Sequence, residues 1–204
     1  MIDTIIFDLG GVLIDWNPRY LYQKIFHTEK ELTWFLTNVC TPEWNELQDA
    51  GRPFAVANQE LIARFPEHES AILSWTTRWE ETIRGSIPET VQVLSTLREA
   101  RQQRLFALTN WSAETFPLAL KRFDFLHWFE GIVVSGEVKM RKPFPEIYQL
   151  LLNRYSIDPG KALFIDDNLK NVETPRLLAV STFLRLSSIK SALAGSMEYC
   201  LSSK

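Results

Sequence analysis

The chain has 204 residues, of which 46% are hydrophobic and 23% are charged, and its formal net charge is −3. These values describe an ordinary globular protein with room for one core and a small insertion, and they exclude the strongly basic surface of a nucleic-acid-binding protein. Cys40 and Cys200 lie far apart and lack metal-ligand spacing. We therefore expect reduced thiols and a cytoplasmic protein. No signal-peptide pattern precedes the first strand and no apolar run is long enough to cross a membrane, so we expect no membrane partner.

The first predicted strand covers residues 4–7 and ends at an acid followed by glycines. Its apolar run, Ile5-Ile6-Phe7, indicates a buried strand of a parallel sheet. Asp8 then lies at the carboxyl end of that strand, where open α/β sheets bind ligands. Gly10 and Gly11 allow a sharp turn and a close approach of the backbone to a ligand. The same stretch is also compatible with an ordinary Gly-Gly turn and an exposed Asp8.

A helical pattern follows and occupies residues 19–84 without a predicted strand. The candidate helices are 19–26, 29–38, 53–65 and 67–83; the last of them repeats apolar residues at the spacing of one helix face. Five of the seven tryptophans fall in or just before this stretch: Trp16, Trp34, Trp44, Trp75 and Trp79. They indicate a small helical bundle with an aromatic core, although one or two of them could line a substrate pocket.

The pattern changes to alternating strands and helices after a linker at 85–88. Predicted strands cover 104–108, 131–134, 162–165 and 180–184, and predicted helices cover 89–100, 143–155 and 189–201. This alternation indicates βαβ units. We therefore expect an α/β fold, with a Rossmann-like three-layer parallel sheet core formed by residues 1–15 and 86–204. The small all-helical domain at 16–85 is inserted into that core.

Polar side chains follow the predicted strands at the point where each strand ends. Asp8 follows the first, and the others are followed by Thr109 and Asn110, by Ser135 and then Lys142, and by Asp166 and Asp167. The carboxyl ends of parallel strands meet at one edge of a sheet, so these groups are expected to converge on one site.

Three carboxylates in one crevice cannot all ionise without a compensating positive charge. A divalent cation with oxygen ligands supplies that charge, and Mg²⁺ typically uses one or two carboxylates together with water and substrate phosphate. Lys142 adds a second positive charge, and Thr109 and Asn110 add neutral hydrogen-bond donors. This set suits a phosphate dianion, with one acid free to attack it as a nucleophile.

Four ordered motifs carry a resemblance that spans the chain. They are Phe7-Asp8-Leu9-Gly10-Gly11-Val12, Leu108-Thr109-Asn110, Lys142-Pro143-Phe144-Pro145-Glu146-Ile147-Tyr148 and Phe164-Ile165-Asp166-Asp167-Asn168. In order and spacing they resemble the motifs of the haloacid dehalogenase superfamily, and the helical insertion resembles its helical cap of the first type. Within the superfamily, Met140-Arg141-Lys142-Pro143 and Asp166-Asp167-Asn168 look like the branch that contains α-D-glucose-1-phosphate phosphatase.

The resemblance implies a phosphatase that acts on a small-molecule phosphate ester, with a sugar phosphate as one case. Asp8 would be the nucleophile and form an aspartyl-phosphate, and Lys142 would neutralise Asp8 and the phosphate. Mg²⁺ would be held by Asp8, the carbonyl of Gly10 and Asp167, with Asp166 as a second or outer ligand. Thr109 and Asn110 would bind the phosphoryl oxygens. Asn171 would support the last motif. Trp111 and Arg19 are our candidates for further substrate contacts, and the sequence leaves monomer and homodimer open.

The main departure from the family pattern is Gly10, because many phosphatases of the superfamily carry a second acid at this position. Without it, the leaving oxygen has no obvious proton donor, and we expect a preference for acidic leaving groups such as aryl phosphates and sugar 1-phosphates. A flat dependence on leaving-group acidity would point to a proton donor in the cap.

Two alternatives stay open at the sequence level. One is a 2-haloacid dehalogenase that uses Asp8 without a metal, with Trp16, Asn17 and Arg19 around the substrate carboxylate and halide. The other is a non-catalytic protein that binds a phosphometabolite or a protein partner.

Overall fold

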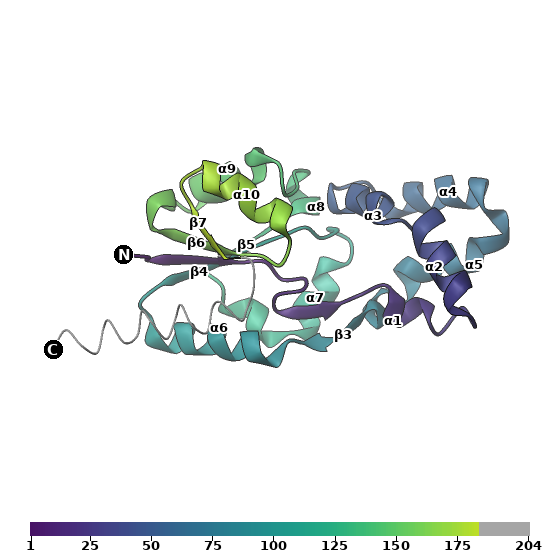
Figure 1. The fold of residues 1–204 in the computed structure, drawn as a ribbon, viewed down its shortest axis with the longest axis horizontal. Coiled ribbons are helices and arrows are strands. Elements are labelled where there is room, and N and C mark those ends of the chain that lie inside the picture. Colours follow the sequence, from purple (N-terminus) through teal and green to yellow (C-terminus); the bar gives the residue numbers. More distant parts are fainter. Residues whose placement is uncertain (184–204) are drawn as a thin grey trace.

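The computed structural model describes residues 1–183, and Figure 1 shows their arrangement. The strands are β1 (Thr4–Phe7), β2 (Ile14–Trp16), β3 (Ile83–Ser86), β4 (Arg104–Thr109), β5 (Gly131–Val134), β6 (Ala162–Ile165) and β7 (Ser181–Phe183). The α-helices are α1 (Arg19–Tyr22), α2 (Glu29–Asn38), α3 (Pro42–Asp49), α4 (Phe54–Arg64), α5 (Glu69–Thr77), α6 (Pro88–Ala100), α7 (Phe116–Arg122), α8 (Ser135–Val138), α9 (Pro145–Arg154) and α10 (Leu169–Leu177). Short 3₁₀ turns occur at Pro66–His68, Trp79–Thr82, Asp124–Trp128 and Pro159–Lys161.

Five strands form one parallel sheet in the order β5-β4-β1-β6-β7. The chain runs from β1 outward to β4 and β5, then crosses to the other side of β1 to form β6 and β7. Phe7 is in register with Ala107 on one side and with Ile165 on the other. The order of the strands therefore reverses at β1, and the carboxyl end of β1 is the position where such sheets bind ligands. The predicted parallel α/β fold is confirmed.

Alternating side chains of the sheet separate two apolar layers. Ile5 and Phe7 belong to the same buried cluster as Leu94 of α6 and Phe116 of α7. Ile6 belongs to the opposite cluster, which includes residues of α9 and α10. Figure 1 shows α9 and α10 on one side of the sheet and α6 on the other. Successive residues of a strand point to opposite faces, so the apolar runs of β1, β4 and β6 cover both faces, as the three-layer prediction requires.

The helices α1 to α5 extend beyond the sheet and are joined to it by a two-stranded stem, as Figure 1 shows. In this stem β2 pairs antiparallel with β3, with Ile14 opposite Ser86 and Asp15 opposite Gly85. The prediction that residues 19–84 contain no strand is therefore wrong at its end, where β3 begins at Ile83. The segment is too short and too polar to show alternation, and its extended form depends on the pairing partner β2.

The helical segment also differs from the prediction in its divisions. The predicted helix 67–83 is divided into a 3₁₀ turn, the helix α5 and a second 3₁₀ turn before β3 begins. The sequence prediction also lacks α3, although two local signals mark its start: the Thr41 hydroxyl accepts a hydrogen bond from the backbone N–H of Trp44 at 3.1 Å, and Pro42 occupies the first turn. The helix predicted at 189–201 lies outside the described residues.

The tryptophans of this segment differ in burial. Trp75 is buried, and its ring packs edge-on against Trp16 and Trp44 at centroid distances of 6.4 and 5.2 Å. Trp34 is exposed instead. The aromatic core predicted for most of them is therefore present. Within residues 1–183, no helix is both long enough and apolar enough to cross a membrane.

Candidate active site

Asp8 lies directly after β1, where the backbone fixes its position. Its N–H donates to the carbonyl of Ile165 at 2.8 Å, so the parallel pairing continues one residue beyond β1 and brings Asp8 beside Asp166. The N–H of Leu9 donates to Oδ1 of Asp8 at 2.7 Å. The side chain is buried at the carboxyl edge of the central strand. The sheet itself therefore positions this carboxylate.

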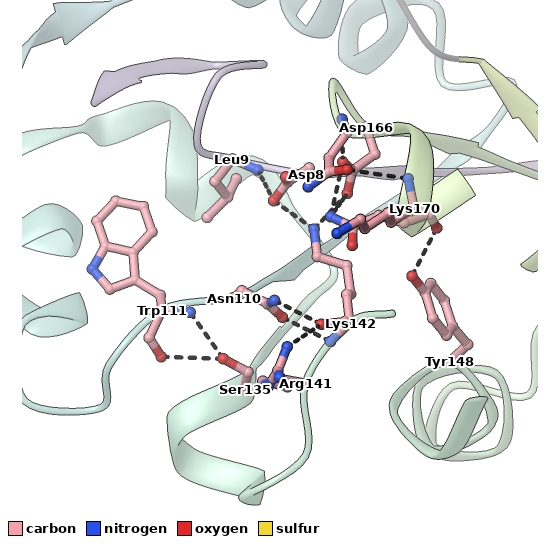
Figure 2. A network of polar contacts seen from close by, with 12 residues as sticks. Asp8, Leu9, Asn110, Trp111, Ser135, Arg141, Lys142, Tyr148, Asp166 and Lys170 are labelled. Carbon is pink, nitrogen blue, oxygen red and sulfur yellow. Dashed lines mark hydrogen bonds and ion pairs between the residues drawn. The ribbon is translucent and has the colours of Figure 1, made fainter. Parts of the chain in front are cut away.

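Lys142 is buried between two of the predicted acids, as Figure 2 shows. Its Nζ lies 2.9 Å from Oδ1 of Asp8 and donates to Oδ2 of Asp166 at 2.6 Å. Burial acts to lower the pKa of Lys142, but the charges of Asp8 and Asp166 outweigh it and raise this pKa above its ordinary value. Lys142 is therefore a fixed positive charge, since both neighbours stabilise the ammonium form.

Asn110 positions Lys142 through the backbone. Its Nδ2 donates to the carbonyl of Lys142 at 3.0 Å, and its Oδ1 accepts from the N–H of Lys142 at 2.8 Å. One hydrogen of the Nδ2 amide is not used by these contacts, and Asn110 also lines the cavity beside the site. Phosphoryl binding by Asn110 therefore stays a prediction. Thr109, the last residue of β4, is buried beside it, and its role in phosphate binding stays a prediction.

Asp166 is held by a network that uses both of its oxygens. Oδ1 accepts from the N–H of Asn168 at 2.9 Å, and Nδ2 of Asn171 lies 3.0 and 3.1 Å from Oδ1 and Oδ2. The hydroxyl of Tyr148 donates to the carbonyl of Asn171 at 2.7 Å. Asp166 is thus a structural anchor for Lys142, and Asn171 supports the last motif as its position suggested.

Asp8, Asp166 and Asp167 form an acidic group that suits a cation. Each offers a carboxylate oxygen, and these oxygens lie within 4.8 Å of one another. Burial raises the pKa of Asp8 to about 8 against the lowering effect of Lys142, and the charges of Asp166 and Asp167 raise it further. One lysine therefore does not balance the group, and a hard divalent ion with oxygen ligands fits it. Because Asp166 is already saturated, Asp8 and the exposed Asp167 are the acids best placed to bind that ion.

The two glycines after Asp8 have different environments. Gly11 has φ +73°, and a Cβ at this position would lie 2.1 Å from Oδ2 of Asp167. A Cβ at Gly10 would meet nothing within 4 Å, and its φ lies outside the left-handed region. Gly11 is therefore required by both the turn and the acid beside it.

We expect Gly11→Ala to lower the free energy of unfolding by at least about 1 kcal/mol, because the left-handed backbone is unfavourable for a residue with a Cβ. The collision with Asp167 adds to this cost. Chemical denaturation measures the difference, with Gly10→Ala as the matched control, for which we expect a change within about 0.5 kcal/mol. Equal stability of the two variants would contradict the described loop.

A cavity of about 70 Å³ opens beside this group, between the helical segment and the sheet edge. Its lining residues are Gly10, Trp16, Asn45, Asp49, Phe54, Trp79, Asn110, Trp111, Ser112 and Thr115. Trp111 is among them, in agreement with its predicted place beside the site. Its Nε1 donates to the Thr115 hydroxyl at 3.2 Å, and its ring packs on Trp79 at 5.5 Å. Three aromatic residues of the helical segment, Trp16, Phe54 and Trp79, form the remaining aromatic lining.

Arg19 is not among the residues that line this cavity, and its role in substrate binding stays a prediction. Its guanidinium pairs with Glu29 and lies 3.5 Å from the Thr33 hydroxyl on the exposed surface. The contact with Arg19 and the hydrogen bond from Thr33 lower the pKa of Glu29. The Glu29 carboxylate on α2 thus explains the position of the Arg19 guanidinium. The sequence pattern did not connect these two residues.

Asp49 is a site residue that the sequence prediction did not place there, and it contacts Ser135, which the prediction did place at this edge. The Ser135 hydroxyl accepts from the N–H of Trp111 at 2.9 Å and donates to the carbonyl of Asp49 at 2.5 Å. Figure 2 shows Ser135 beside the backbone of Trp111. The end of β5 marks Ser135 as a candidate, whereas Asp49 carries no signal without α3.

Comparison with known proteins identifies the family. The family model of haloacid dehalogenase-like hydrolases matches residues 2–176. The chain belongs to this hydrolase family. It is 27% identical over 180 residues to a sesquiterpene phosphatase of Aspergillus oryzae, covering 82% of this chain and 81% of that one. It is 23% identical over 194 residues to a phosphorylated carbohydrates phosphatase of Thermotoga maritima, with 85% and 80% covered.

Solved structures agree with this assignment. A HAD family enzyme of Bacteroides thetaiotaomicron, in complex with magnesium and inorganic phosphate, is 25% identical with a TM-score of 0.68, covering 90% of this hydrolase and 93% of that enzyme. L-2-haloacid dehalogenase of Xanthobacter autotrophicus has a TM-score of 0.63 at 16% identity, with 89% and 76% covered. The second similarity shows a shared fold only.

Proposed function

We propose that this hydrolase is a Mg²⁺-dependent phosphatase that cleaves a small phosphate ester through an aspartyl-phosphate on Asp8. The observation that carries the proposal is the buried Lys142 between Asp8 and Asp166, with the exposed Asp167 beside them. A fixed positive charge, a nucleophilic carboxylate and an oxygen-rich cation site are the parts that transfer of a phosphoryl group requires. The phosphatases among the relatives support the same reaction class.

Asp8, the carbonyl of Gly10 and Asp167 would hold the Mg²⁺, and Asp166 would take an outer position. When bound, the ion supplies positive charge that stabilises the phosphoryl oxygens and keeps Asp8 ionised. The acidic group fits this ion because carboxylate oxygens already converge there with one balancing lysine. The magnesium and phosphate in the Bacteroides thetaiotaomicron enzyme are consistent with the assignment.

Each residue of the site has a separate role in the proposed reaction. An oxygen of Asp8 attacks phosphorus, the bond to the leaving oxygen breaks, and an aspartyl-phosphate forms; water then attacks phosphorus and releases phosphate and the free carboxylate. Lys142 neutralises charge on Asp8 and the phosphoryl oxygens, Asp166 and Asn110 hold Lys142 in place, and Thr109 contributes a donor. Preorganised charge of this kind costs little reorganisation during the reaction.

We further propose that residues 16–85 form a cap of the first type over the core of residues 1–15 and 86–204. The stem formed by β2 and β3 supports this division, since both connections between the parts run through it. The aromatic and polar wall around Trp111 would contact the leaving group. Aromatic faces beside Asn45 suit the alternating apolar and hydroxyl-bearing faces of a sugar, and we propose a sugar phosphate of the glucose-1-phosphate type as the substrate.

The structure does not favour the 2-haloacid dehalogenase alternative. Arg19 is paired with Glu29 on the exposed surface, so the cation expected to bind the substrate carboxylate is engaged elsewhere. The acidic group around Asp167 also has no role in a metal-free reaction. A purely binding protein would not need a nucleophile held against a buried lysine.

We expect hydrolysis of p-nitrophenyl phosphate to require Mg²⁺, to stop in excess EDTA and to return when Mg²⁺ is restored, because Asp8 is not kept ionised by Lys142 alone. The same protein is expected to release no halide from 2-chloropropionate. Phosphate and halide release, each measured with and without EDTA, test the proposal. Full turnover in EDTA would contradict the metal site, and halide release would support the dehalogenase.

A further inference from the structure

The space in front of Gly10 is open on the side of the reacting group. A Cβ at Gly10 would meet nothing within 4 Å, and Gly10 lines the cavity beside Asp8. Gly10 therefore places no side chain at the position where many family members carry an acid. The proposed reaction nevertheless requires a proton for the leaving oxygen of the ester. A donor from another element can reach this space.

Asp49 lines the same cavity as Gly10. It is the last residue of α3, and among the described residues that line the cavity it alone carries an ionisable side chain. The other polar lining groups are amides and hydroxyls, which exchange protons poorly at neutral pH. The cavity is small, so a leaving group that fills it lies close to both Gly10 and Asp49.

The end of α3 is fixed to the core on several sides. The carbonyl of Asp49 accepts from the Ser135 hydroxyl at 2.5 Å, and its carboxylate accepts from Nδ2 of Asn45 at 3.1 Å. Glu46 pairs with Arg141 at 3.0 Å, one residue before Lys142. The contacts connect α3 to the start of α8 and to the loop of the catalytic lysine, so Asp49 has a defined position relative to the site.

The surroundings of Asp49 suit a group that exchanges protons near neutral pH. Burial raises the pKa of Asp49 to about 7, and the charge of Glu46 raises it further. Arg141, Lys142 and the backbone N–H of Ser112 act in the opposite direction. A carboxyl with such a pKa is present in both forms at pH 7, as general acid and base catalysis requires.

We propose that Asp49, supplied by α3 of the cap, is the proton donor and acceptor that replaces the missing acid at Gly10. The inference rests on the proposed phosphatase function. In the first step the Asp8 oxygen bonds to phosphorus, the bond to the ester oxygen breaks, and that oxygen takes the proton of the neutral Asp49 carboxyl. In the second step the Asp49 carboxylate takes a proton from water, and the water oxygen bonds to phosphorus. The bond between Asp8 and phosphorus then breaks, which releases inorganic phosphate and the free Asp8 carboxylate.

This assignment changes the expected substrate dependence. With Asp49 in place, the wild type should show a shallow dependence of kcat/KM on leaving-group acidity. The steep dependence on leaving-group acidity, which the sequence predicts from the missing acid at Gly10, is then expected for Asp49→Asn. The amide of this variant cannot donate a proton to the leaving oxygen. The cap would therefore complete the catalytic set as well as enclose the substrate.

The test compares wild type and Asp49→Asn across p-nitrophenyl, phenyl and glycerol phosphates with Mg²⁺ present. We expect kcat/KM for glycerol phosphate to fall by about 10²–10⁴-fold and that for p-nitrophenyl phosphate to change little, because nitrophenolate leaves without a proton. Loss of the base should also slow the second step, so that Asp49→Asn releases a burst of about one p-nitrophenol per active site. The decline of wild-type kcat/KM for glycerol phosphate above about pH 7 should be absent in the variant.

Two further variants test whether the effect is due to the carboxyl group of Asp49. Glu43→Gln changes an exposed acid of the same helix, outside the cavity lining, and should retain the wild-type dependence. Gly10→Asp in the Asp49→Asn background places a carboxyl in the open space and should recover turnover of glycerol phosphate.

An equal loss for all three esters would overturn the role of Asp49 as proton donor and indicate a merely structural contact. An unchanged dependence in Asp49→Asn would overturn it too. If the wild type hydrolysed none of the esters, the proposed function itself would fail, and the role of Asp49 with it.

Discussion

Asp8→Asn is expected to abolish turnover of every phosphate ester, with a loss on the order of 10⁶-fold, as when other enzymes lose their nucleophile. The amide cannot form the aspartyl-phosphate, and the substitution also removes a proposed metal ligand. The variant should nevertheless fold. The pKa of Asp8 is raised to about 8, so the metal-free fold favours the protonated carboxyl, and its stability falls as the pH rises towards 8. A neutral Asn removes that cost.

The measurement is kcat/KM for p-nitrophenyl phosphate, together with the thermal midpoint of the metal-free protein. Asp3→Asn is the matched control, because Asp3 is an exposed acid that precedes the same strand and accepts a hydrogen bond from the Thr4 hydroxyl at 2.9 Å. We expect near wild-type activity for the control and a midpoint for Asp8→Asn no lower than that of the wild type. Substantial turnover by a folded Asp8→Asn would exclude Asp8 as the nucleophile.

Lys142→Ala is expected to lose both activity and stability. The variant leaves the carboxylates of Asp8 and Asp166 facing each other in a buried site without the ammonium that lies 2.9 and 2.6 Å from them. Loss of one preorganised charge costs about 2.7–4 kcal/mol in transition-state stabilisation, or about 10²–10³-fold in rate. Breaking a buried charge pair destabilises a fold by roughly 3–5 kcal/mol.

The two effects are separated by measuring kcat/KM at a temperature where the variant is folded, and unfolding by denaturant in parallel. Lys161→Ala is the control, because Lys161 forms an exposed pair with Asp158 at 3.3 Å and should change neither quantity appreciably. Wild-type kcat/KM in Lys142→Ala would place this lysine outside the reaction.

The sheet and its functional edge could be predicted from the sequence because both depend on local pattern. The apolar run before Asp8 and the strand before Asp166 are buried on both faces, so they show as uninterrupted hydrophobic segments. A parallel sheet then brings the residues after each strand to one edge regardless of the connections between them. The convergence of Asp8, Asp166 and Asp167 follows from this rule alone.

Contacts between distant segments could not be predicted in the same way. The extended form of β3 depends on its pairing with β2, and the side chain of Asn110 is turned to the backbone of Lys142 by a loop 32 residues away. Arg19 of α1 forms an ion pair with Glu29 of α2. The position of Asp49 depends on α3, which the sequence prediction lacks, and on the hydrogen bond from Ser135 to the Asp49 carbonyl. Hydrophobic periodicity in one sequence does not indicate such a contact.

The most direct test of the central claim is chemical trapping of the phosphorylated enzyme. The protein is mixed with p-nitrophenyl phosphate and Mg²⁺, quenched, reduced with borohydride and digested, and peptide masses are recorded. Reduction converts an aspartyl-phosphate to homoserine, so the account predicts this change at residue 8 and its absence in EDTA. Turnover without modification, or modification at a different acid, would contradict a mechanism built on Asp8.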